Sequence, residues 1–149
     1  MKILPLSIKI YLTLIILHSN KNDLAKEYFD RALKEFKAYD MKEAIASCNI
    51  NLGALAVRLN QMDLAKDYYE TALSISKNIG NNSAIKDCYD GLFKFYSKKG
   101  DYRSALTNYQ LFINYRDSLS NEENTKKFVQ AQMNYEFDKK EQVAKLDQE

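Results

Sequence analysis

The residues best suited to metal or nucleophilic chemistry are a single histidine, His18, and two cysteines, Cys48 and Cys88. A catalytic or metal-binding histidine needs other polar groups that converge on it. The carboxylate nearest to His18 in the sequence is Asp23, and no second ligand accompanies it. We therefore interpret His18 as a solvent-facing histidine at the end of a helix, and we expect no metal site.

The two cysteines lie 40 residues apart. Forty residues is also the period of the repeat described below, so both cysteines take the same position in successive repeats. Packed helices lie roughly 10 Å apart, whereas the Cα atoms of a disulfide lie within about 7 Å. The spacing therefore predicts two buried thiols rather than a disulfide or a metal pair, and it leaves the redox compartment open.

The sequence carries no motif of a common enzyme class. It has no glycine-rich phosphate loop, no paired-cysteine motif and no nucleophile elbow. With 22 Lys and Arg against 20 Asp and Glu, the net charge of +2 provides no strong field for nucleic acid. We interpret the charged run at 122–141 as a solvated helix face. These features predict a chain without enzymatic activity, cofactor or nucleic-acid partner.

Composition indicates one helical domain over residues 1–149. A chain of 149 residues can bury a core without disulfides or metals. It is 46% apolar and 28% charged, and it has only four glycines and one proline. Because glycine and proline separate short strands, their scarcity favours helices throughout.

The chain repeats itself every 40 residues. Residues 23–33 recur as 63–73 with seven of eleven positions identical, and a weaker third copy covers 103–113. Apolar residues recur at three- and four-residue steps within each copy, which places them on one face of a helix. The columns are Ile8, Cys48, Cys88; Leu12, Leu52, Leu92; Ile15, Leu55, Phe95; Ala25, Ala65, Ala105; and Phe29, Tyr69, Tyr109.

Each repeat is predicted to be a pair of amphipathic helices. The expected helices are 4–19 and 22–38, then 41–59 and 62–79, then 83–99 and 102–117. Gly80 and Gly100 supply helix stops, and the polar residues after them supply caps. Ser120 with Glu123 reads as a capping box that opens a seventh helix at 120–147, which caps the array or projects from it.

These residues resemble the tetratricopeptide repeat. The resemblance rests on Asn51-Leu52-Gly53, Asp63-Leu64-Ala65, Tyr69 and Ala72-Leu73, and again on Gly100-Asp101-Tyr102 with Ala105-Leu106 and Tyr109. It covers about three repeats, 4–38, 41–79 and 83–117. It implies a right-handed α-α superhelix of about three hairpins with a C-terminal helix. The 40-residue period exceeds the usual length of about 34, which implies longer helices.

The resemblance also implies where a partner would bind. In this family the first helix of each pair lines the concave face, which selects Ile10, Leu14 and Leu17, then Ile50, Asn51, Ala54, Val57 and Arg58, then Asp87, Asp90 and Lys94. The family's two-carboxylate clamp for chaperone tails does not fit, because only Asn51 matches it. We therefore expect a non-catalytic scaffold that binds a protein or peptide.

The tail has a second, looser resemblance, to the repeat region of Bacteroidetes-type signalling proteins. It rests on Tyr115-Arg116-Asp117-Ser118-Leu119, Asn121-Glu122-Glu123-Asn124 and the stretch 135–141. In such proteins a helix here leads to a membrane span and a histidine kinase or DNA-binding domain. The resemblance implies the repeat portion of a bacterial signal-transduction protein, cytoplasmic, or periplasmic if it belongs to a membrane-anchored sensor.

The first seventeen residues are apolar on nearly every side. They could be mistaken for a secretory signal, but Lys9 interrupts the run and no small-residue cleavage site follows Leu17. The uncharged stretch 10–17 is also too short for a membrane span. We interpret them as a repeat helix that needs a cover, either an upstream repeat or a second copy of the chain. Self-association through residues 3–17 is therefore the alternative function.

Overall fold

The computed structural model describes Ile8 and residues 22–148. The described residues form helices α2 (Asn22–Ala38), α3 (Lys42–Arg58), α4 (Met62–Ile79), α5 (Asn82–Lys99) and α6 (Tyr102–Leu146), and they contain no strand. The predicted all-helical repeat fold is confirmed. The expected first helix, 4–19, lies outside the described residues except for Ile8.

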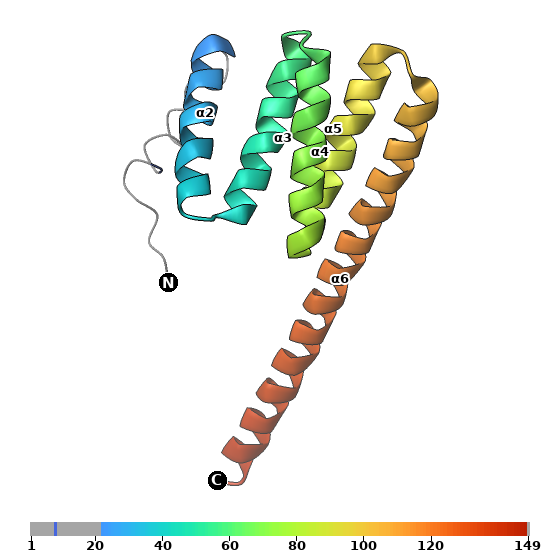
Figure 1. Cartoon of the computed structure of the whole chain (residues 1–149). Helices are drawn as coiled ribbons and strands as arrows, with labels where there is room; N and C mark the ends of the chain where they lie inside the picture. The colour runs from blue at the N-terminus through green and yellow to red at the C-terminus, as the bar shows by residue number, and fades with distance from the viewer. Residues whose placement is uncertain (1–7, 9–21, 149) are drawn as a thin grey trace. The chain divides into compact units, whose positions relative to one another are not determined.

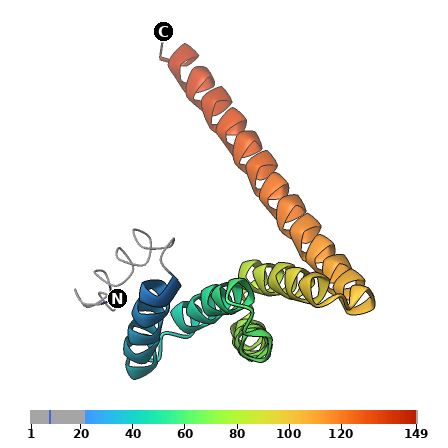
Figure 2. The ribbon, with the colours of Figure 1, turned by 90° about the horizontal axis from the view of Figure 1, so that it is seen from above.

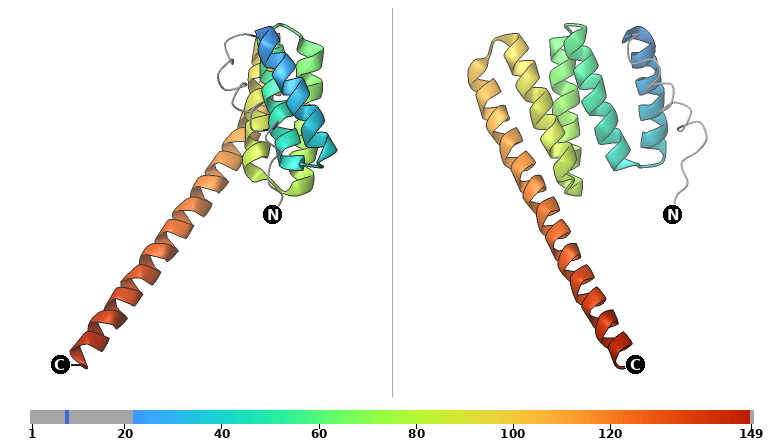
Figure 3. Two further views of the ribbon diagram at one scale, coloured as in Figure 1. Left: turned by 90° about the vertical axis from the view of Figure 1, so that its left-hand side faces the viewer. Right: turned by 180° about the vertical axis from the view of Figure 1, so that it is seen from behind.

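The chain divides into two compact units, Met1–Tyr115 and Arg116–Glu149. In the first unit, helices α2 to α5 run alternately in opposite directions and follow one another in chain order (Figure 1). The same succession is visible from above in Figure 2 and from behind in Figure 3. α3 contacts α2, α4 and α5, so its neighbours include the first helix of the next repeat.

Each turn between these helices contains one residue in the left-handed conformation. These residues are Asp40, Asn60, Gly80 and Gly100, with φ between 50° and 83°. They recur every 20 residues, once per helix. Glycine, asparagine and aspartate tolerate this conformation better than other residues. The prediction of helix stops at Gly80 and Gly100 agrees with this series, and Asp40 and Asn60 have the same role without a glycine.

Polar side chains cap two of the helices. The Asn81 side chain accepts a hydrogen bond from the Ala84 amide at 3.0 Å, at the start of α5. Asp101 accepts two bonds from Ser104, at 3.2 Å from its amide and 2.7 Å from its hydroxyl. These hydrogen bonds lower the pKa of Asp101. The caps satisfy amides that have no partner within the helix.

The core consists of two clusters in the first unit. The first joins Ile8 to α2 and α3, and includes Phe29, Phe36, Cys48, Leu52 and Leu55. The second joins α3, α4 and α5, and includes Ala65, Tyr69, Tyr89, Leu92 and Phe95. The predicted columns therefore face the core in every described member except Tyr109, which is 41% exposed.

The predicted helix break at 118–119 is wrong. α6 runs from Tyr102 to Leu146, so Ser120 and Glu123 lie inside a helix and do not open a new one. Glu123 pairs instead with Lys127 at 2.8 Å, one turn further on. A capping box can act only where the preceding helix ends. The next position in the series of left-handed turn residues is occupied by Ser120, and serine is poorly suited to that conformation.

Candidate protein-binding surface

The predicted binding residues of the second and third repeats lie on α3 and α5. Asn51, Ala54 and Arg58 are exposed, and Ile50 and Val57 are half-buried because they pack against the second core cluster. On α5, Asp87 and Lys94 are exposed and Asp90 is half-buried. Ile10, Leu14 and Leu17 lie outside the described residues. We call the α3 and α5 residues together the α3–α5 face.

A hydrogen bond joins the two helices of this face, α3 and α5. The ammonium group of Lys98 on α5 donates to the carbonyl oxygen of Val57 at the end of α3, at 2.6 Å. The last carbonyls of a helix lack partners within it and carry partial negative charge, so a lysine there is favourable. The bond places the last turns of α3 and α5 side by side.

Charges on the face are partly paired. Lys94 binds Asp90 at 2.7 Å, and Lys86 lies 3.5 Å from Asp87. Among the residues that the structure describes, Arg58 has no carboxylate partner. A guanidinium group offers five donors in a fixed plane, which suits a carboxylate of another molecule. The α3–α5 face thus offers apolar surface from Ile50, Ala54 and Val57 beside one cation.

The two cysteines are buried free thiols, as the sequence predicts. Burial raises the pKa of Cys48 to about 12. It also raises the pKa of Cys88 to about 11, although the Ser76 hydroxyl beside Cys88 acts in the opposite direction. Because the thiolate is the reactive form, neither residue is suited to nucleophilic chemistry. Within residues 22–148 no cluster of histidine, cysteine and carboxylate side chains could hold a metal ion.

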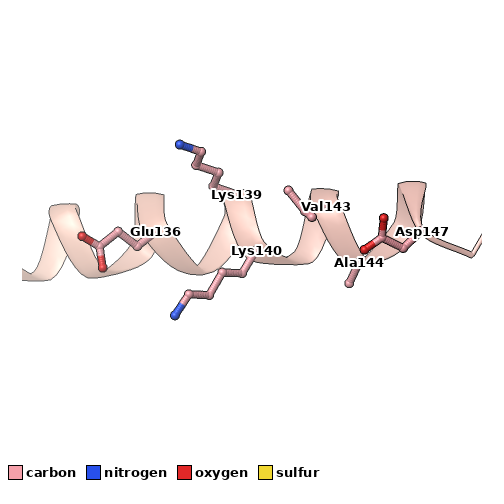
Figure 4. Close-up of a pocket in the computed structure, with 6 residues that line it drawn as sticks. All are labelled: Glu136, Lys139, Lys140, Val143, Ala144 and Asp147. Atoms are coloured by element: carbon pink, nitrogen blue, oxygen red, sulfur yellow. The ribbon is translucent and has the colours of Figure 1, made fainter.

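One hollow of the described surface lies along α6. It measures about 440 Å³ and is bordered by Glu136, Lys139, Lys140, Val143, Ala144 and Asp147. Figure 4 shows that all six side chains leave a single helix, with no second element opposite them. It is therefore the flank of one helix and lacks the concave walls of a ligand site.

A smaller groove lies between α5 and α6 in the first unit. Its volume is about 240 Å³, and its lining residues are Phe93, Ser97, Tyr102, Ala105, Leu106 and Tyr109. Two ring contacts join the helices here, Phe93 to Tyr109 at 5.0 Å and Tyr89 to Tyr115 at 5.7 Å. We call it the α5–α6 groove. The predicted binding residues do not include this groove, although the sequence holds one signal for it: Leu106 takes the position of Lys26 and Lys66 in the earlier repeats.

None of the described helices is both long and apolar enough to cross a membrane. This finding covers the described residues, which exclude most of the apolar stretch at 3–17.

Comparisons with known proteins support the repeat. Residues 46–79 match the family model described as Tetratricopeptide repeat. Among solved structures, the chain is similar to the crystal structure of BtubC (BKLC) from P. vanneervenii, with a TM-score of 0.68 and 23% identity over 76% of this chain and 48% of that one. The chain thus spans about half the length of that protein. A search of the curated proteins found no match.

At 23% identity the structural likeness establishes the fold alone. The matched segment, 46–79, covers most of α3 and all of α4, which form the second predicted repeat. This chain therefore contains a tetratricopeptide repeat, a module that typically serves as a non-catalytic scaffold for protein–protein interaction.

Proposed function

We propose that the chain binds a segment of a partner protein along the α3–α5 face. The observation that supports the proposal is the Lys98–Val57 bond, which joins the C-terminal ends of α3 and α5. An apolar strip from Ile50, Ala54 and Val57 lies beside Arg58 on that surface. A matching partner is a helix or extended peptide with an apolar side and an acidic residue at one end.

The binding experiment uses the whole chain and a displayed library of peptides that vary in apolar spacing and in acidic residues. Enrichment of acidic, amphipathic peptides is expected. Replacing a residue at the centre of an interface commonly costs about 1 kcal/mol or more. Arg58→Ala should therefore weaken binding of a selected peptide roughly fivefold or more, and Asn51→Ala should weaken it as well.

Two exposed residues outside the face serve as matched controls, Arg103→Ala for the arginine and Asn82→Ala for the asparagine. These changes should leave affinity unaltered. Binding that persists after both Asn51→Ala and Arg58→Ala would place the interface elsewhere on the molecule.

We also propose that the chain is the repeat portion of a bacterial signal-transduction protein. The support is the resemblance of the tail, from Tyr115 to Leu119 and from Asn121 to Asn124, to such proteins. The gene's full reading frame tests this proposal. A downstream membrane span followed by a kinase or DNA-binding domain is expected, and a frame with neither of these would contradict it.

Self-association through residues 3–17 is the second candidate function. Its support is the apolar character of that segment in the sequence, including Ile10, Leu14 and Leu17. Light scattering of the whole chain and of an Ile10→Lys/Leu14→Lys variant tests it. A dimer that the double change abolishes is expected, whereas a dimer that survives the change would rule it out.

A further inference from the structure

The second unit, residues 116–149, is a single helical segment, and among its described residues only Leu119 is half-buried while the others are exposed. One set of its residues recurs at alternating steps of three and four positions. The average step is the one at which two helices keep the same side toward each other as they wind together. We call this set the α6 seam, and its members are Leu119, Glu122, Lys126, Val129, Met133, Glu136, Lys140 and Val143.

The α6 seam repeats one order of side-chain types. The four residues from Leu119 to Val129 are apolar, acidic, basic and apolar in turn, and the four from Met133 to Val143, 14 positions later, have the same order. Reversing the direction of the chain exchanges acidic with basic positions and leaves apolar positions apolar. A second copy that runs in the opposite direction therefore offers an apolar residue to each apolar one and an opposite charge to each charge.

The antiparallel pair is centred on position 131, and its layers follow from that centre. From the centre outward, the facing residues of the two copies are Val129 and Met133, then Lys126 and Glu136, then Glu122 and Lys140, then Leu119 and Val143. Val129, Met133 and Val143 are 47%, 60% and 51% exposed within one chain. They therefore have apolar surface that the second copy can bury.

The charged layers disfavour the other arrangements of two copies. In a parallel pair in register, Glu122 faces Glu122 and Lys126 faces Lys126, and such like-charge contacts are destabilising. In an antiparallel pair shifted by one heptad, Glu122 faces Met133 and Lys126 faces Val129, so the charges lose their partners. Polar layers of this kind fix the register and orientation of paired helices more than they stabilise them.

The pairing within one chain leaves these charges free to engage a second copy. Glu122 and Lys126 form an ion pair at 2.9 Å along the helix, with both side chains more than half exposed. An exposed pair of this kind contributes little to stability, so its exchange for a partner in another chain costs little. Glu136 and Lys140 have the same spacing. Because half of the seam is charged, we expect a reversible association rather than a permanent one.

We propose that two copies of the chain pair antiparallel along the α6 seam, with ion pairs from Glu122 to Lys140 and from Lys126 to Glu136 on both sides of an apolar centre. The interface is two-fold symmetric, so each contact occurs twice. It uses neither the α3–α5 face nor residues 3–17, so it stands or falls separately from the functions proposed above.

Sedimentation equilibrium on the whole chain tests the pairing with variants that exchange charges and change neither composition nor net charge. Glu122→Lys/Lys126→Glu exchanges the charges in the first half of the α6 seam, and Glu136→Lys/Lys140→Glu exchanges those in the second half. In either variant, every charged layer of the antiparallel pair joins like charges. A reversible dimer is expected for the unaltered chain, and each half variant should raise its Kd about tenfold or more.

The fourfold variant that combines both exchanges identifies the orientation. With both halves exchanged, each charged layer of the antiparallel pair joins opposite charges again, so Kd should return to within about threefold of the original. In a parallel pair in register, the same exchanges leave like charges facing like charges throughout. Recovery in the fourfold variant after loss in the half variants is therefore specific to the antiparallel pair.

Two kinds of control separate this contact from other modes of association. Phe128→Lys and Tyr135→Lys alter side chains that are 69% and 68% exposed and lie on another side of the helix from the α6 seam. Each should leave Kd within about threefold of the original. The Ile10→Lys/Leu14→Lys variant should leave this contact unchanged as well. All the altered seam residues are exposed, so the chain should stay helical, which circular dichroism verifies.

Three results would overturn the antiparallel pairing. The first is a monomer at all concentrations up to about 1 mM. The second is a dimer whose Kd the half variants leave unchanged, as a parallel pair or a contact through another surface would give. The third is a fourfold variant that associates as weakly as the half variants, which would show that the exchanges act on the helix itself and not on a contact between copies.

Discussion

The ring of Tyr69 lies against Gly91 so closely that a methyl group at Gly91 would overlap the ring atoms Cε1 and Cζ. Gly53 faces the same ring, and a Cβ atom there would lie 2.9 Å from it. Tyr69 belongs to α4, whereas the two glycines belong to α3 and α5. One aromatic side chain thus sets the packing distance between the first helices of two successive repeats.

Replacing Gly91 with alanine tests this contact, because the contact decides whether the free energy of unfolding rises or falls. Helix propensity alone favours alanine by about 1 kcal/mol, whereas overpacking a filled core costs about 1–3 kcal/mol. Because the ring cannot move away without opening the core, we expect Gly91→Ala to lower the free energy of unfolding. Urea denaturation measures it.

The double change Tyr69→Leu/Gly91→Ala is the control, because leucine leaves room for the added methyl group. The two changes should couple, so that Gly91→Ala costs less in the leucine background. A stabilising effect of Gly91→Ala in the unaltered chain would refute the contact.

The column of small residues predicts that two alanines differ in how much stability is lost when each is replaced by leucine. Ala65 is buried where α4 packs against the neighbouring helices, and Ala54 is exposed on α3. Ala65→Leu should destabilise the fold by about 1–3 kcal/mol, because the helices must separate to admit the larger side chain. Ala54→Leu should change stability by less than about 0.5 kcal/mol. Thermal melts of both variants compare them, and equal melting temperatures would contradict the observed helix pairing.

The cap of α5 gives a local prediction. Asn81 accepts a bond from the Ala84 amide, and its loss leaves that amide without a protein partner. Asn81→Ala should therefore lower the free energy of unfolding by about 1 kcal/mol. The exposed neighbour Asn82 is the control residue, and Asn82→Ala should have little effect. A comparable loss from both changes would show that the cap contributes nothing specific.

The buried thiols predict a loss of stability in alkaline solution. Their folded pKa values, about 12 for Cys48 and about 11 for Cys88, lie above the ordinary value of 9.0. The unfolded chain therefore releases these protons first as pH rises past 9, and the free energy of unfolding falls between about pH 9 and pH 11–12. Below pH 9 the two thiols contribute no pH dependence.

Cys88→Ala should reduce the slope of stability against pH above 9, because one of the two groups is then absent. A thiol reagent provides an independent measurement. At pH 8 both cysteines should react only as fast as the chain unfolds, and rapid modification of either in the folded protein would contradict their burial.

Much of the architecture was predictable from local patterns. The expected helices 22–38 and 62–79 have the observed bounds. The observed α3 is one residue shorter at each end than the expected helix 41–59, and α5 begins one residue before the expected helix 83–99. The 40-residue period also placed Cys48 and Cys88 correctly as buried, separate thiols. Periodicity and turn residues act within a few positions of one another, so the sequence displays them directly.

The expected break at Ser120 shows where a local pattern fails. A capping box lies at the right place, but a cap stabilises a helix start only if the chain also turns there. The deciding residue is the one in the left-handed position, and serine does not supply it. The sequence signal for the turn was weaker than the tendency of the helix to continue.

By itself, then, the sequence determined the helical repeat, its period and the residues that each helix turns toward a neighbour. Only the tertiary structure decided which of those neighbours is present: Tyr69 is enclosed between Gly53 and Gly91, whereas Tyr109, its equivalent, is half-exposed beside Phe93. The physical reason is that an amphipathic pattern records which side of a helix avoids water, whereas burial also depends on a second element, distant in the sequence, that packs against it.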